Sequence, residues 1–144
     1  MQEIHLTRQS SNQLLKKILK NNGVGIARVI IASYAITDDW MRLLQKMRIS
    51  YQIEKIIIVL DREVMIRHRE KLNQLIFSAD EVYLTDSHAK MYYAEGQKPT
   101  VVVTSANATR NFRNESSFLT DDPELVSQML QDINTLINES YRII

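Results

Sequence analysis

Residues 82–107, VYLTDSHAKMYYAEGQKPTVVVTSAN, are the most informative part of the sequence. Three segments within it, 82–84, 91–94 and 100–103, are rich in β-branched or aromatic residues, which favours strands. The residues Gly96-Gln97-Lys98-Pro99, between the second and third segments, are typical of a turn. We therefore expect short consecutive strands, the last two of them forming a hairpin.

Polar side chains follow or precede these predicted strands. Residues two apart on a strand face the same side, so we expect His88 and Lys90 to project together and Ser105 and Asn107 to share a face. If the hairpin forms, the two pairs lie at adjacent strand ends. An imidazole, an ammonium group, a hydroxyl and an amide are suited to holding and attacking a phosphodiester. The stretch therefore predicts a phosphate site.

Hydrophobic patterning outside this stretch predicts alternating strands and helices. The apolar runs at 29–31 and 56–60 are expected of strands covered on both faces. The other expected elements are a helix after Ser10 or Ser11 ending at Asn21-Asn22-Gly23, a helix from Thr37 through Met47, a helix over 62–78 with Val64, Met65, Leu72, Leu75 and Ile76 inward, a strand over 116–119, and a last helix starting at Asp122-Pro123 with an apolar stripe. This order predicts an α/β fold, with one sheet between helices.

The bulk composition narrows the class of protein. At 144 residues, with 44% hydrophobic and 24% charged residues, the chain suits one soluble globular domain. It has no cysteine, which excludes a disulfide framework and thiolate metal sites. The opening residues lack a secretory signal and no apolar run approaches a membrane span, so we expect a cytoplasmic protein. A net charge of +1 gives no global attraction for nucleic acid, so such affinity must come from local clusters.

The pattern His88-x-Lys90-x4-Glu95, followed by Ser105-x-Asn107, resembles the His-x-Lys-x4-Asp and Gly-Ser-x-Asn motif of the phospholipase D superfamily. The later Asn114-Glu115 is similar to the Asn-x-Glu region of that family's small bacterial endonucleases. The chain departs from the family in having Glu95 for Asp, Thr104 for Gly, and a longer spacing between Glu95 and Ser105. The resemblance implies a mixed sheet in an α/β/α sandwich over residues 24–144. Residues 1–23 would then carry an N-terminal helix added for packing or dimer formation.

The resemblance also implies a role for each motif residue. His88 would attack phosphorus to form a phosphohistidine, and Glu115 would orient its imidazole. Lys90 and Asn107 would hold phosphate oxygens, Ser105 would add a hydroxyl donor, and Glu95 would take a supporting position. The scheme requires no metal and no cofactor.

The presence of a single motif predicts that two copies of the chain assemble. The chemistry needs a second histidine to protonate the leaving oxygen, yet the motif occurs once. His68, in Arg67-His68-Arg69, is better explained as part of a solvated helix face. We therefore expect a homodimer in which two copies of His88 meet at a twofold axis.

Other residues are candidates for substrate binding. Lys98, Arg110 and Arg113 are expected in loops that flank the phosphate site, where cations would bind a nucleic-acid backbone. Phe112 could stack on a base, or pack on its own domain. The cations Arg62, Arg67, Arg69 and Lys71 are better explained as solubilising charges, and Tyr34 as a core residue, with lining of the cleft as the alternative.

The leading hypothesis is a metal-independent phosphodiesterase that cleaves DNA or RNA. The alternative is a catalytically degenerate module for nucleic-acid binding or assembly, which the three departures from the motif would favour. Lipid hydrolysis or phosphatidyl transfer is less expected, because the sequence has no membrane helix and its basic loop suits a polyanion.

Overall fold

A single sheet organises the chain. The structure, a computed structural model, describes residues 1–6, 10–109 and 114–144. Its strands are β1 (Gln2–His5), β2 (Arg28–Ser33), β3 (Lys55–Asp61), β4 (Glu81–Thr85), β5 (Met91–Glu95), β6 (Thr100–Thr104), β7 (Ser117–Thr120) and β8 (Tyr141–Arg142). Its helices are α1 (Ser11–Asn22), α2 (Asp38–Tyr51), α3 (Arg62–Arg67), the 3₁₀ turn η1 (Arg69–Lys71), α4 (Leu72–Ser78) and α5 (Pro123–Asn138).

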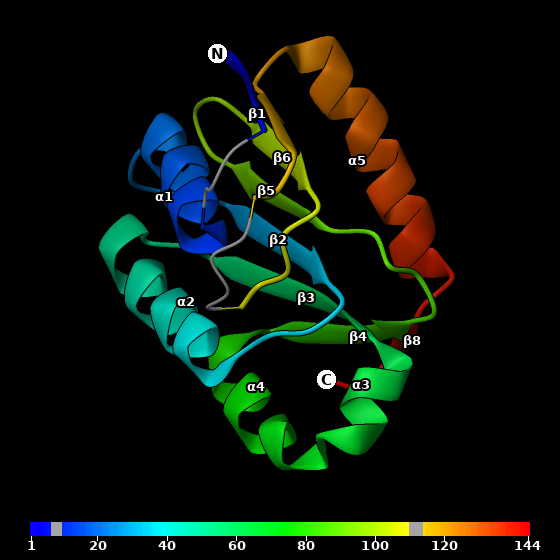
Figure 1. Cartoon of the computed structure of the whole chain (residues 1–144). Helices are drawn as coiled ribbons and strands as arrows, with labels where there is room; N and C mark the ends of the chain where they lie inside the picture. Colours follow the sequence, from blue (N-terminus) through cyan, green and yellow to red (C-terminus); the bar gives the residue numbers. More distant parts are fainter. Residues whose placement is uncertain (7–9, 110–113) are drawn as a thin grey trace.

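The strands follow the order β1-β7-β6-β5-β2-β3-β4-β8 across the sheet (Figure 1). β2, β3 and β4 are parallel neighbours, whereas β5, β6 and β7 pair antiparallel, so the sheet is mixed as expected. The apolar run Val29–Ile31 in β2 is fully buried, because both faces of this central strand are covered.

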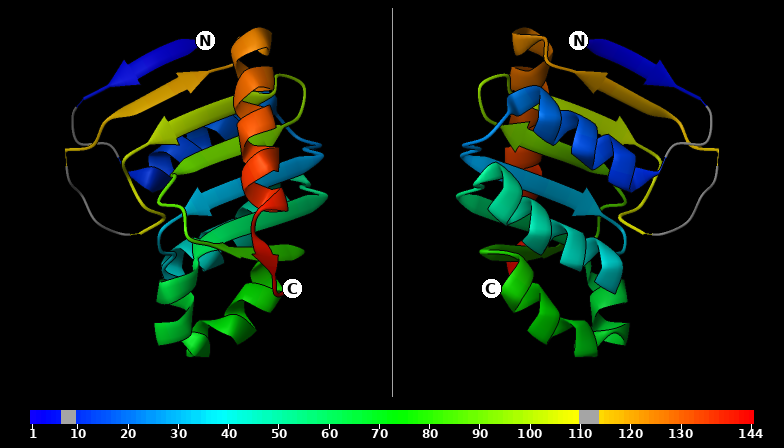
Figure 2. Two further views of the ribbon diagram at one scale, coloured as in Figure 1. Left: turned by 90° about the vertical axis from the view of Figure 1, so that its right-hand side faces the viewer. Right: turned by 90° about the vertical axis from the view of Figure 1, so that its left-hand side faces the viewer.

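Helices cover both faces of the sheet. Helices α1 and α2 lie on one face and α5 lies across the other (Figure 2). On the first face, Leu14 of α1 and Trp40 of α2 join the larger core; on the second, Val126 and Ile133 of α5 pack against the sheet. The predicted α/β/α sandwich and the predicted apolar stripe of the last helix are therefore confirmed.

The helix starts follow their capping residues. Thr37 accepts a hydrogen bond from the Trp40 N–H at 3.4 Å and caps α2, and Asp122 caps α5 with Pro123 at the first helical position. Ser10, rather than Ser11, caps α1, in a capping box with Gln13.

Two elements differ from the sequence-based expectation. The first residues form β1, which pairs antiparallel with β7, and Leu14, Leu15 and Ile18 of α1 are fully buried. Residues 1–6 and 10–22 are thus built into the same sheet and core as the rest. The single helix expected over 62–78 is instead broken at His68 (φ −127°, ψ 49°) into α3, η1 and α4. Leu72 and Ile76, both expected inward, are 38% and 52% exposed.

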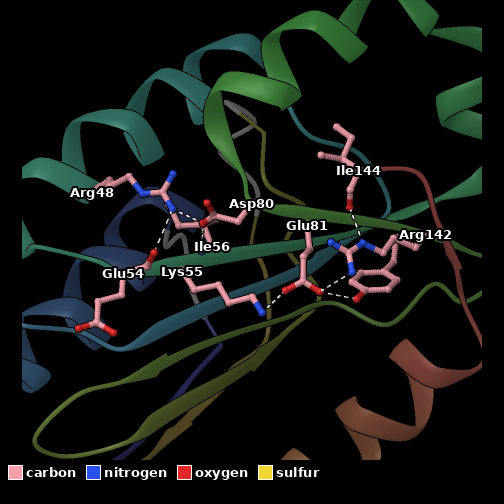
Figure 3. A network of polar contacts seen from close by, with 9 residues as sticks. Arg48, Glu54, Lys55, Ile56, Asp80, Glu81, Arg142 and Ile144 are labelled. Atoms are coloured by element: carbon pink, nitrogen blue, oxygen red, sulfur yellow. Dashed lines mark hydrogen bonds and ion pairs between the residues drawn. The ribbon is translucent and has the colours of Figure 1, made fainter.

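A buried carboxylate ties the end of the chain to the sheet. Glu81, at the start of β4, pairs with Lys55 of β3 and, at 3.6 Å, with Arg142 of β8 (Figure 3). Tyr83 also donates a hydrogen bond to Glu81 at 2.5 Å. Burial acts to raise the pKa of Glu81, but the hydrogen bonds from Lys55 and Tyr83 and the two cationic charges outweigh it, so the pKa lies below its ordinary value.

The pairing of the strands determines which loops meet. β5 runs antiparallel to both β2 and β6, and Met91, its first residue, lies opposite Ala32 of β2 and Val103 of β6. The carboxyl ends of β2 and β6 therefore meet the amino end of β5. We call this the motif end of the sheet; it comprises residues 33–34, 88–90, 104–107 and 115–117.

Candidate active site

His88 and Lys90 lie in the connection between β4 and β5, and not on a strand. The expectation that they project from one strand face is therefore wrong. His88 is exposed and Lys90 half-buried, and the Lys90 Nζ donates to the His88 carbonyl oxygen at 3.3 Å. The Lys90 carbonyl in turn accepts from the Thr104 N–H at 3.1 Å, which joins this connection to the end of β6.

Asn107, just beyond β6, is held by the end of β2. Its Oδ1 accepts a hydrogen bond from the Tyr34 N–H at 3.1 Å and one from the Ser33 hydroxyl at 3.4 Å. Because the carbonyl end of the amide is fixed in this way, the Nδ2 group is the end left to donate. An amide donor at this place can hold a phosphate oxygen.

The hydroxyl groups of Tyr92 and Ser33 form hydrogen bonds with the backbone on either side of Asn107. The Tyr92 hydroxyl donates to the Ala106 carbonyl at 2.7 Å, and Ser33 Oγ accepts from the Ala108 N–H at 2.9 Å. Burial raises the pKa of Tyr92, so its hydroxyl stays protonated and keeps donating. The loop that carries Ser105 and Asn107 is therefore anchored at successive residues.

Glu115 reaches the motif end but contacts a different group from the one expected. The Ser105 hydroxyl donates to its Oε2, and the Ser116 N–H donates to Ser105 Oγ at 3.0 Å. Within the described residues, the partner of Glu115 is thus Ser105, whereas the resemblance implied His88.

The imidazole of His88 instead stacks on Tyr34. The two ring centroids are 4.9 Å apart and the ring planes differ by 16°. The Tyr34 hydroxyl accepts a hydrogen bond from Arg67 Nη2 at 3.3 Å. Tyr34 is half-buried at the motif end and belongs to neither buried core, so the expected core position is wrong, and lining of the cleft stays a prediction. Arg67, expected to be a solubilising charge, also has a specific partner.

Two of the predicted residues lie at the opposite end of the sheet. Glu95 ends β5 there and forms an ion pair with Arg28 at 3.1 Å. Lys98 lies in the β5–β6 turn, where its N–H donates to Asn22 Oδ1 at 3.2 Å. The expectation that Lys98 flanks the phosphate site is therefore wrong within one chain. The β5–β6 turn lies a full strand length away from the motif end. The remaining candidates, Arg110, Phe112 and Arg113, lie outside the described residues.

A groove of about 610 Å³ runs between residues 87–90 and α5. Its lining includes the apolar side chains of Met91, Val101 and Met129, and it also includes Asp132 and Glu139 of α5. Carboxylates repel a phosphate, so the part of this groove that suits one is the end formed by His88 and Lys90.

Exposed apolar side chains cross the sheet beside the motif end. Ile4 of β1 and Val103 of β6 both lie opposite Phe118 of β7, and they are 72% and 43% exposed. Leu6 is 74% exposed. We call Ile4, Leu6, Val103 and Phe118 the apolar strip. These four residues line one hollow together with Ser105 and Ser116, so the strip is continuous with the candidate site.

The described residues lack two further features. No group of three or more His, Asp or Glu side chains within residues 1–6, 10–109 and 114–144 could hold a metal ion. No helix in that part of the chain has the length and apolar character needed to cross a membrane.

Comparison with known proteins gives similarity in structure and none in sequence. No protein-family model and no curated protein matches the chain. The phospholipase D family member Nuc from Salmonella typhimurium has a TM-score of 0.71 at 15% identity, over 99% of each chain. NucT from Helicobacter pylori has a TM-score of 0.72 at 18% identity, over 99% of this chain and 100% of its own. TrmBL2, an archaeal chromatin protein with a novel mode of DNA binding, has a TM-score of 0.68 at 13% identity, over 99% of this chain and 54% of its own. The chain therefore has the fold of the phospholipase D family.

Proposed function

We propose that this chain is a metal-independent phosphodiesterase, a nuclease that cleaves DNA or RNA through a phosphohistidine on His88 in a homodimeric active site. The observation that carries the proposal is the convergence at the motif end. His88 and Lys90 come from one connection, Ser105 and Asn107 from the end of a neighbouring strand, and the amide of Asn107 is fixed with Nδ2 left to donate. The fold shared with Nuc and NucT, and with the DNA-binding TrmBL2, supports a nucleic-acid substrate.

In the proposed reaction, an imidazole nitrogen of His88 attacks phosphorus and forms an N–P bond. The P–O bond to the leaving strand breaks, and the partner's copy of His88, in its imidazolium form, gives a proton to the leaving oxygen. A water molecule then attacks the phosphohistidine and gives a proton to the same neutral imidazole. The N–P bond breaks, which releases a phosphomonoester and restores both histidines. Lys90 and Asn107 hold the phosphate oxygens throughout.

The second histidine has to come from another copy of the chain. His5 contacts Glu3 at 2.9 Å and His68 contacts Glu70 at 3.2 Å, and both lie outside the motif end. The apolar strip beside Ser105 is the surface that we propose for the partner copy, because exposed apolar side chains gathered on a sheet face mark interaction sites. A twofold axis next to this strip would bring the two motif ends together.

One observation favours the alternative of a degenerate module for nucleic-acid binding or assembly. Glu115 pairs with Ser105, so the carboxylate that would orient the nucleophile is engaged elsewhere. In that case the motif end would bind a phosphate without cleaving it.

Cleavage of labelled single- and double-stranded DNA and RNA in EDTA distinguishes the two functions. We expect wild-type protein and His68→Ala, a control in an exposed histidine, to cleave in EDTA, and His88→Ala to be inactive. Binding without cleavage by a folded wild-type protein would favour the degenerate module. Equal cleavage by His88→Ala would overturn both.

A further inference from the structure

We infer that Tyr34 is a positioning residue that holds the imidazole of His88 and the amide of Asn107 in place for the proposed reaction. The inference rests on the proposed function for its chemistry but on separate contacts for its geometry. Tyr34 directly follows β2, and through its ring and its backbone it contacts both halves of the motif.

The ring of Tyr34 supports an exposed nucleophile. A ring-centroid distance of 4.9 Å with planes 16° apart is an offset stack, the arrangement that aromatic pairs favour. An exposed histidine in a connection would otherwise sample several rotamers, and each would place its nitrogens differently. The stack limits these rotamers and therefore reduces the loss of freedom when the imidazole aligns with phosphorus.

The ring face also suits the charge that develops in the reaction. When the imidazole becomes bonded to phosphorus, or takes up a proton as the acid, it carries positive charge. The face of a tyrosine ring attracts a cation stacked on it. Tyr34 therefore stabilises His88 in both of the roles that the two copies would play.

The backbone of Tyr34 orients the second half of the motif. Its N–H donates to Asn107 Oδ1 at 3.1 Å, and this contact does not depend on the tyrosine side chain. The ring and the N–H of one residue thus hold the nucleophile and a phosphate donor in one mutual arrangement.

Arg67 contacts the hydroxyl group of the Tyr34 ring. Its Nη2 donates to the Tyr34 hydroxyl at 3.3 Å, and it comes from the last turn of α3. The chain of contacts Arg67–Tyr34–His88 gives this exposed arginine a role that the sequence does not reveal. Since the hydrogen bond is exposed, we expect the stack to depend on it less than on the ring itself.

Two measurements on variants of Tyr34 report the ring stack and the cleavage reaction independently. In Tyr34→Leu the ring is lost, whereas the N–H to Asn107 is kept; Tyr34→Phe keeps the ring and loses only the contact with Arg67. Tyr141→Leu, at a tyrosine that is 72% exposed on β8, is the matched control. NMR of the His88 imidazole C–H protons reports the stack through the ring-current shift, and steady-state cleavage reports kcat and KM.

We expect the ring-current shift in the wild type and in Tyr34→Phe, and its loss in Tyr34→Leu. We also expect Tyr34→Leu to lower kcat on the order of 10²-fold with little change in KM, while Tyr34→Phe and Tyr141→Leu stay near wild type. The absence of a shift in the wild type, or an unchanged kcat in Tyr34→Leu after the shift is lost, would overturn the inference. A clear shift in a wild-type protein that cleaves nothing would refute the proposed function and uphold the orientation of His88 by Tyr34.

Discussion

Asn107 is held at its carbonyl end, and this determines what a substitution there would do. In Asn107→Asp the oxygen that accepts from the Tyr34 N–H is kept, so the loop should fold as before. The donor Nδ2 becomes a carboxylate oxygen, which repels a phosphate. Loss of one such donor typically costs about 10²–10³-fold in rate, and we expect at least this fall in kcat/KM.

The matched control for this substitution is Asn134→Asp, which makes the same charge change at an exposed position of α5. It should leave kcat/KM near the wild-type value. Equal losses in the two variants would mean that the added charge acts at long range and that Asn107 does not contact the phosphate.

The residues of the site were predictable only in part. The resemblance of the motif to the phospholipase D superfamily predicted His88, Lys90, Ser105, Asn107 and Glu115 as site residues, and their roles stay a prediction. Tyr34 and Arg67 carry no such signal. Tyr34 follows an apolar strand, which favours a core position, and Arg67 belongs to a charged helix, which favours exposure to solvent. Only the pairing of β2 with β5 brings Tyr34 beside His88, and this pairing joins segments far apart in the chain.

At the scale of elements, Glu81 links β3, β4 and β8. Its pKa lies below its ordinary value of 4.5, so its ion pairs stabilise the fold above that pH and the stabilisation is lost as pH falls through the lowered pKa. Hydrogen bonds to charged groups are worth roughly 1.5–3 kcal/mol. We expect Glu81→Gln to lower the free energy of unfolding by about 2 kcal/mol at pH 7.

Denaturant unfolding at several pH values checks this. The difference between wild type and Glu81→Gln should shrink as pH falls below 4.5 and through the lowered pKa of Glu81. The control Glu63→Gln, in the exposed first turn of α3, should have little effect at any pH. A difference that persists at low pH would show that Glu81 acts through packing and not through charge.

Strong periodic patterns predicted elements well, and weak ones did not. The apolar runs of β2 and β3 and the stripe of α5 were predicted, because burial on both faces or on one stripe leaves a clear pattern. β1 (Gln2–His5) was missed because an edge strand of four residues with polar and apolar side chains has little signal. The break at His68 was missed because Met65 and Leu75, both buried, also fit one continuous helix.

At the scale of the whole molecule, the apolar strip should form the contact between two copies. Ile4→Glu places a charge in this strip and should convert a dimer into a monomer. The monomer should keep its fold and lose cleavage, because the second histidine is no longer supplied. Light scattering of the purified protein measures the mass directly.

Ile49→Glu is the control for the dimer, since Ile49 is 81% exposed on α2, on the other face of the sheet. This variant should remain dimeric and active. A wild-type protein that is monomeric and still cleaves would contradict the two-copy site, as would an Ile4→Glu monomer with full activity.

The proposed reaction requires that His88 becomes bonded to phosphorus, and trapping this intermediate is a direct test. An oligonucleotide reaction quenched in alkali, where phosphohistidine survives, can be digested and analysed by mass spectrometry. We expect a nucleotide adduct on His88, at no more than one per two chains because the other copy acts as the acid. Efficient cleavage with no adduct on His88, or with the adduct on another residue, would contradict it.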